Sequence, residues 1–129
     1  MNELNIEDDC RTAIATAIPS ARVTALPPVR EIITDVPIIV VNLVEGDSEP
    51  FAQGNRNNYY VNGTLRISIN SLSKSQTISY HSTIHASLAN IADTFRISYA
   101  GFSNTIDMEG EKPIYVRELN YIVNYKEVF

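Results

Sequence analysis

The sequence predicts an α+β domain in which two helices pack on one face of a mostly antiparallel sheet of four to five strands. Two segments, 3–18 and 76–95, carry apolar residues at helical spacing. Two others, 59–70 and 114–127, alternate with period two and are rich in β-branched and aromatic residues. The 129 residues are enough for one domain, 1–129, with a core that needs no disulfide.

Composition narrows the classes of function. The net charge is -5 and the ten Lys and Arg are scattered, so the sequence lacks the basic stripe of a nucleic-acid binder. No apolar run approaches the ~20 residues of a membrane helix, and the acidic, polar segment 1–11 is unlike a signal peptide. Cys10, the single cysteine, forms neither an internal disulfide nor, with only two His, a zinc cluster. We therefore expect a protein of a reducing compartment, without metal or cofactor.

The first half of the chain predicts a helix, two strands and a loop, in that order. The helix, 3–18, has acidic residues in its first turns and is ended by a proline. Cys10 falls on its apolar stripe and is expected to be a small buried side chain. A short strand, 21–26, precedes a continuously apolar one, 38–44, which we expect to be covered on both faces. The segment 45–58 is rich in Gly, Asn, Ser and acidic residues and predicts a long loop.

One alternating segment, 59–70, admits two interpretations. The pair Asn62-Gly63 is a strong hairpin signal. A two-residue hairpin there would pair Tyr59 with Arg66 and mix the two faces of the segment, whereas one continuous strand keeps the faces separate. We therefore favour a single strand, in which Gly63 marks a bulge or a close backbone approach.

The second half predicts a helix, a long connection and a final strand. The helix, 76–95, has apolar residues at steps of three and four. The connection, 97–113, contains at most a short strand at its start and then a polar, acidic stretch, 104–112. The last strand, 114–127, separates two faces, one of which carries Tyr115, Arg117, Leu119, Tyr121, Val123 and Tyr125.

The two alternating strands are long for a domain of this size. At ~3.3 Å per residue, 59–70 spans about 40 Å and 114–127 about 46 Å, against a domain diameter of roughly 36 Å. Their ends must bend or project. A projecting strand edge is a natural binding place for another subunit, so we expect the protein to be part of an assembly.

The sequence contains no recognisable catalytic motif. His81 and His85 have the four-residue spacing of a helical two-His metal site, but no Glu follows His81 and no third ligand is evident. Asp107, Glu109 and Glu111 lie in a polar segment without a neighbouring His or Ser, so we interpret them as surface charges. The protein is therefore predicted not to be an enzyme.

Three segments resemble one protein family. The first is Val36-Pro37-Ile38-Ile39-Val40-Val41-Asn42-Leu43, a proline followed by an apolar strand. The second is the alternating Gly63-Thr64-Leu65-Arg66-Ile67-Ser68-Ile69. The third, Glu118-Leu119-Asn120-Tyr121-Ile122-Val123-Asn124-Tyr125-Lys126, has a Leu and two Tyr at the spacing typical of the family. Together with the acidic first helix and the long second helix, most of the chain resembles the tail terminator proteins of long-tailed bacteriophages, the family of the lambda minor tail protein U.

The resemblance implies a structural role in the virion. Such proteins form a hexameric ring that caps the tail tube, ends its polymerisation and provides the surface for joining the head. The implied partners are other copies of the chain in a homo-hexamer, the tail tube protein and a head–tail connector or neck protein. DNA passes through the ring without specific binding, which suits six copies with a total charge of about -30. The implied location is the tail–neck junction, after assembly in the host cytoplasm.

A closed ring needs two different patches on each subunit. The candidate interface residues are Arg56, Tyr60, Arg66, Asp107, Tyr115, Arg117 and Glu118. The arginines are expected in the first loop or at outward or edge positions of strands, paired with acids of a neighbour, and the tyrosines as aromatic anchors. The loops 46–58 and 103–112 are the predicted contacts with the tube or connector.

Three other interpretations stay open. A head-completion or tail-completion protein would share the ring but contact the portal side. A small-molecule-binding or regulatory α+β domain would have a ligand pocket between helices and sheet. An enzyme with dispersed carboxylates would use Asp107, Glu109 and a His.

Overall fold

The computed structural model contains two helices and five strands in the part of the chain that it describes. It describes residues 3–25, 37–50, 58–91, 95–108, 110 and 112–128, and the side chains of these residues except 3–5, 45–50, 58–61 and 126–128. In chain order the elements are α1 (Glu3–Ala17), β1 (Arg22–Thr24), β2 (Ile38–Pro50), β3 (Asn58–Ser71), α2 (Lys74–Ala89), β4 (Arg96–Asp107) and β5 (Ile114–Val128).

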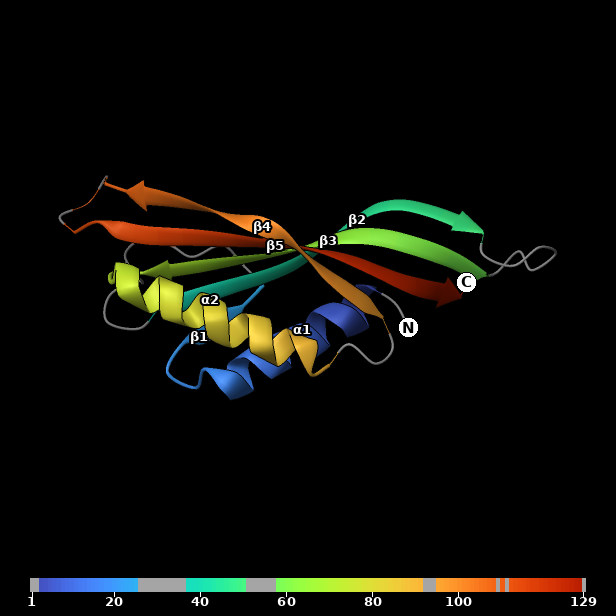
Figure 1. Ribbon diagram of the computed structural model, residues 1–129, viewed down its shortest axis with the longest axis horizontal. Helices are drawn as coiled ribbons and strands as arrows, with labels where there is room; N and C mark the ends of the chain where they lie inside the picture. Colours follow the sequence, from blue (N-terminus) through green and yellow to red (C-terminus); the bar gives the residue numbers. More distant parts are fainter. Residues whose placement is uncertain are drawn as a thin grey trace.

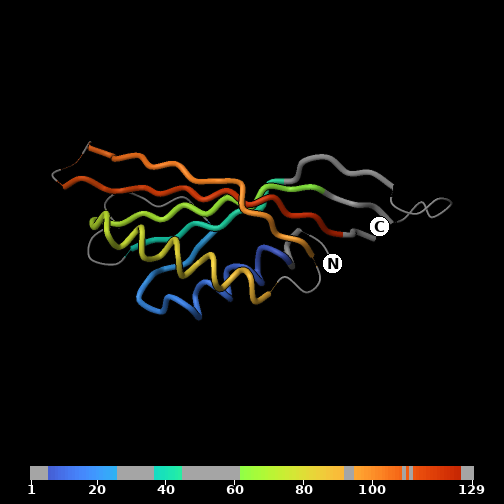
Figure 2. The backbone as a smooth tube through the Cα atoms, viewed as in Figure 1, coloured from blue at the N-terminus to red at the C-terminus, as the bar shows by residue number. Residues whose placement is uncertain are grey.

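The strands form one sheet with the order β1-β2-β3-β5-β4. Only β1 and β2 run parallel, and the other three neighbouring pairs are antiparallel. Both helices lie on the same side of the sheet (Figure 1). The chain trace in Figure 2 shows β4 running beside β5 at one edge. The predicted α+β architecture, two helices on one face of a mostly antiparallel sheet, is confirmed.

The core lies between the two helices and the sheet. The largest fully buried side chains are Ile6, Ile14, Ile39, Val41, Leu65, Ile67, Ile69, Ile84, Leu88, Leu119 and Tyr121. Cys10 is also fully buried, as predicted, and this burial raises the pKa of its thiol to about 12. The thiol therefore stays protonated and packs as a small apolar group.

The other face of the sheet is covered at one end and open at the other. Ile38, Val40 and Ile114 are buried there, which confirms that the start of β2 is covered on both faces. Further along the same face, Val44 and Ile122 are each 46% exposed. The expectation for 38–44 therefore holds up to the middle of the segment and not at its end.

The segment around Gly63 is one continuous strand, as predicted. Gly63 pairs with Glu45 on one side and Val123 on the other, so no hairpin turn occurs there. A Cβ atom at this position would lie 3.1 Å from a methyl carbon of Leu43 and 3.1 Å from the carbonyl oxygen of Val44. Gly63 therefore marks a close approach between β3 and β2.

Two segments predicted as loops are partly strands. The backbone of 45–50 continues β2 along β3, with a register shift between Glu45 and Ser48, while 51–57 lies outside the described residues. The short strand allowed at the start of the predicted connection 97–113 is present, but the connection is wrong from Gly101 to Asp107, because β4 pairs with β5 as far as Asp107. In both cases a neighbouring strand supplies the hydrogen-bond ladder, and this pairing overrides the polar composition.

The second helix begins and ends earlier than predicted. The side chain of Ser73 accepts a hydrogen bond from the backbone N–H of Gln76, which starts α2 at Lys74. At the other end the backbone N–H of Asn90 donates to the Ser87 carbonyl, and α2 ends at Ala89 rather than at 95. Neither helix of the described chain is long and apolar enough to cross a membrane.

Candidate functional site

The clearest open surface lies beside β4, the last strand of the sheet. α1 packs on β1 and β2, and α2 packs on β3 and β5, so the layer of helices stops before β4. Tyr99, Phe102 and Ile106 of β4 are 43%, 47% and 54% exposed, and Ile78 of α2 faces them at 50%. We call the surface between these two elements the α2–β4 groove. It is lined by Lys74, Ile78, His81 and His85 of α2, by Tyr99, Phe102, Asn104 and Ile106 of β4, and by Tyr115, Arg117 and Tyr121 of β5.

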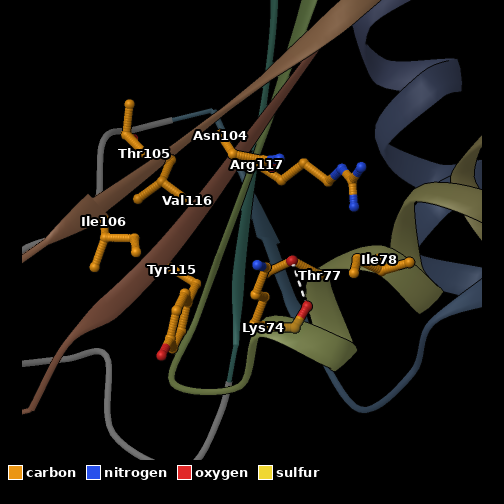
Figure 3. Close-up of a pocket in the computed structure, with 9 residues that line it drawn as sticks. All are labelled: Lys74, Thr77, Ile78, Asn104, Thr105, Ile106, Tyr115, Val116 and Arg117. Carbon is orange, nitrogen blue, oxygen red and sulfur yellow. Dashed lines mark hydrogen bonds between the residues drawn. The ribbon is translucent and has the colours of Figure 1, made fainter.

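One end of the groove deepens into a cavity of about 330 Å³ (Figure 3). Its lining residues are Lys74, Thr77, Ile78, Asn104, Thr105, Ile106, Tyr115, Val116 and Arg117. The hydroxyl of Thr77 is already used, because it donates to the Lys74 carbonyl at 2.7 Å. The lining thus combines apolar side chains with two basic residues, Lys74 and Arg117.

Aromatic rings fill the middle of the groove. The His81 ring lies 5.1 Å from Phe102 and 5.7 Å from Tyr99 between ring centres. The His85 ring meets Tyr99 edge-on at 5.4 Å, and its Nδ1 atom lies 3.3 Å from the Tyr121 hydroxyl. These contacts tie the open strand β4 to α2 through side chains rather than through a covering helix.

Arg117 is the most unusual residue of the groove. The alternation of β5 places it on the same face as Leu119 and Tyr121, and only 8% of it is exposed. Its Cζ atom lies 4.1 Å from the centre of the Phe102 ring, and its Nε atom has no hydrogen-bond partner. The expectation that Arg117 occupies an outward or edge position is therefore wrong, because its backbone position follows the buried face of the strand.

The charged groups that line the groove are cations. α2 contains no acidic residue, and Lys74 and Arg117 stand at the cavity. The pKa of His81 is lowered below its usual 6.5, mainly because the ring is partly buried and to a smaller extent because the charges of Arg117 and His85 lie nearby. Burial raises the pKa of Tyr121 to about 12, so its hydroxyl is neutral at pH 7. A basic groove therefore lies on a chain whose net charge is -5.

The structure brings together two of the predicted interface residues. Tyr115 and Arg117 both line the cavity, and Tyr115 is half-buried there. Arg66 is exposed, as expected of an outward position, and it shares the opposite face of the sheet with the half-buried Glu118. Asp107 is half-buried at the end of β4.

Two other predicted residues cannot be placed in this way. Arg56 and the side chain of Tyr60 lie outside the described residues, as does most of the predicted loop 46–58. The second predicted loop, 103–112, belongs to β4 as far as Asp107.

Sequence reasoning missed the β4 wall of the groove. The sequence did contain a signal for a strand, because Ile97 and Tyr99 are separated by an even number of positions and so are Phe102 and Ile106, as expected for side chains on one face of a strand. The two runs are out of phase with each other, and the structure explains this by a bulge between Tyr99 and Gly101.

The arrangement is suited to binding. In the residues that the structure describes, no group of three or more His, Cys, Asp or Glu side chains is placed to hold a metal ion. Exposed aromatic and aliphatic side chains beside a strand edge, with two cations at one end, fit an apolar segment that also carries a carboxylate. The chain matches no protein-family model and no curated protein sequence.

Proposed function

We propose that this chain is a subunit of a hexameric ring that caps the tail tube of a long-tailed bacteriophage. The observation that carries the proposal is the α2–β4 groove, where four large apolar side chains are 43–54% exposed next to the edge strand of the sheet. In the proposed ring the next subunit covers this groove. The resemblance of three sequence segments to tail terminator proteins supports the choice of a phage tail.

The proposed ring acts by binding alone and needs no catalytic step. One side of the ring covers the end of the tube and blocks the addition of further tube subunits, and the other side meets a connector or neck protein of the head. Six copies bring a charge of about -30, which lets DNA slide through the ring without being held. The proposed location is the tail–neck junction of the virion.

The first test is the mass of the assembly. Light scattering behind a sizing column should give a species near six times the 14.4 kDa of the chain, or one that grows toward it with concentration. Phe102→Glu should return the protein to a monomer, because it places a charge in the covered groove. Ile122→Glu is the matched control, since Ile122 is 46% exposed against 47% for Phe102 but lies on the opposite face of the sheet. If the protein still assembles with Phe102→Glu but not with Ile122→Glu, the interface lies on the face of Ile122 and not in the groove.

The second test concerns the tube. Added to polymerising tail tube protein, the purified chain should stop growth and appear as a cap in electron micrographs, and Phe102→Glu should not. Co-sedimentation with isolated tails supports a terminator, whereas co-sedimentation with isolated heads alone supports a head-completion or other neck protein.

One observation favours a second candidate function, a domain that binds a small carboxylate. The 330 Å³ cavity is within the size range of ligand pockets and has apolar walls with two cations. This candidate predicts a monomer that binds glutarate, a simple dicarboxylate, in calorimetry. A hexamer without glutarate binding would exclude it.

A further inference from the structure

Arg117 carries a buried charge that the described part of the chain does not neutralise. It is 8% exposed, and its Nε atom makes no hydrogen bond. The ion pairs seen among the described side chains join Arg11 to Glu7 and to Asp8, and none involves Arg117. Burying an unpaired charge is costly, and stacking on Phe102 compensates for only part of that cost. Among the described residues Arg117 has no counter-ion, so its site can accept an anion from another molecule.

The surroundings of Arg117 indicate the kind of anion. Lys74 lines the same cavity, and the polar residues Asn104 and Tyr115 line it as well. Ile78 and Ile106 form apolar walls beside these polar groups. The planar guanidinium group matches a carboxylate, which accepts two parallel hydrogen bonds from it. A carboxylate on a short apolar stem fits this site, with the stem between the two isoleucines.

The layer of helices indicates where the carboxylate comes from. α1 lies over one edge of the sheet and α2 over its middle, and no helix of the described chain lies over β4 (Figure 1). A ring of identical subunits joins two different patches of each copy, and joining the α1 edge of one copy to the β4 edge of the next would use opposite edges of the sheet. The helix of the second copy then continues the layer across the groove.

The exposed side of α1 has the charge and the shape for this position. Asp9, Thr12 and Thr16 are exposed and share one stripe of the helix. Asp8 is paired with Arg11, whereas Asp9 has no ion-pair partner among the described side chains. The two threonines are small, so the helix can approach the groove closely. An acidic helix thus faces a basic groove.

We infer that the cavity at the Lys74 end of the groove is a carboxylate site, and that Asp9 of a second copy of this chain occupies it. Arg117 and Lys74 hold the carboxylate, and Phe102 keeps the guanidinium group of Arg117 in place. The inference rests on the proposed ring, because it names the two surfaces that meet in it.

Charge reversal at two exposed positions tests the inference. Lys74→Glu and Asp9→Lys each place like charges together in every interface of a ring made from one variant, so each should weaken self-association at least about tenfold in Kd. A one-to-one mixture of the two variants should assemble again, because in an alternating ring every interface joins opposite charges. Sedimentation velocity measures both effects. Arg22→Glu, an equal charge reversal at an exposed residue on the opposite face of the sheet, should leave assembly unchanged.

The outcomes separate the inference from the proposed function. If the unaltered chain forms rings and the single variants do too, or if the mixture fails to reassemble, the inference is wrong while the ring stands. A chain that stays monomeric even with tail tubes present overturns both. A saturable shift of the Arg117 Nε–H signal on adding millimolar glutarate to the monomer would assign the site to a free carboxylate instead. Lys74 and Asp9 are both exposed, so their variants should fold.

Discussion

The two edges of the sheet end in different ways. At the β2 edge, β1 pairs with Ile38–Val40, and beyond β1 the carboxylate of Glu7 accepts a hydrogen bond of 2.6 Å from the backbone N–H of Leu43. α1 covers the side chains of this edge. At the β4 edge the described chain supplies neither a further strand nor a helix, and the side chains of Phe102 and Ile106 are about half exposed.

The difference shows which edge the subunit has closed for itself. Open strand edges invite pairing with other chains, and proteins commonly block the edges that they do not use. Here the first helix blocks the β2 edge with a single carboxylate. The β4 edge keeps its apolar side chains in the open, which is expected of a surface that another molecule covers.

The largest expected effect compares one apolar side chain at each edge. Leu43, 4% exposed on β2, belongs to the core, whereas Ile106 on β4 is 54% exposed. Leu43→Ala should lower the free energy of unfolding by about 2–5 kcal/mol, because it leaves a cavity. Ile106→Ala should lower it by less than about 1 kcal/mol, because half of the side chain is already in water. Urea unfolding at a concentration where the chain is monomeric measures both, and equal losses would mean that Ile106 is covered in the free subunit.

The next effect concerns the blocked edge itself. Glu7→Ala should cost about 1.5–3 kcal/mol in urea unfolding, because it removes the charged acceptor of the Leu43 N–H. Glu7→Gln should cost less, since an uncharged oxygen stays in place.

A neighbouring acid serves as the control for Glu7. Asp8 is exposed and bonds only Arg11 among the described residues, so Asp8→Ala should change the stability by less than about 1 kcal/mol. Similar losses for Asp8→Ala and Glu7→Ala would show that Glu7 acts through the charge of the helix rather than through the strand edge.

The sequence was sufficient for the parts of the fold in which one period persists. α1, β3 and β5 each keep a single spacing of apolar residues over most of their length, so each could be predicted with its buried face. That spacing also placed Arg117 on the face of Leu119 and Tyr121. Its burial was therefore open to prediction, but its charge favoured the interpretation of a surface residue.

The open edge could not be predicted in the same way. The extra residue between Tyr99 and Gly101 exchanges the positions that face the helices, so the two halves of β4 do not show one continuous alternation in the sequence. The groove also depends on strand order, because it exists where β4 extends the sheet past α2. Strand order is set by contacts between distant segments, and no local pattern reports them.

The bulge offers a smaller test of the open edge. Gly101 has φ of 125°, a conformation that residues with a side chain rarely adopt, although no atom lies within 4 Å of a Cβ placed there. Gly101→Ala should therefore cost about 1–2 kcal/mol in urea unfolding through backbone strain alone. Ser98→Ala, an exposed change on the same strand, should stay within about 0.5 kcal/mol. A loss no larger than that of Ser98→Ala would show that β4 can rearrange its bulge freely.

The smallest expected effect is the titration of His81, which reports the charge of the open edge. In the free subunit the pKa of His81 should lie below 6.5, because burial disfavours the charged ring and the charges of Arg117 and His85 disfavour it further. As pH falls through 6.5, the unfolded chain takes up a proton before the folded one does, so this residue should lower the stability of the monomer on acidification.

Nuclear magnetic resonance of the His81 ring measures this pKa directly. His85→Gln removes one of the two positive neighbours and should raise it toward 6.5. Tyr99 and Phe102 are the other aromatic side chains against the ring, and neither is a carboxylate. A pKa at or above 6.5 in the monomer would mean that an anion already faces His81. In an assembled ring, a carboxylate of the neighbour beside Arg117 should raise the pKa above its value in the monomer, and the same titration then distinguishes an occupied groove from an empty one.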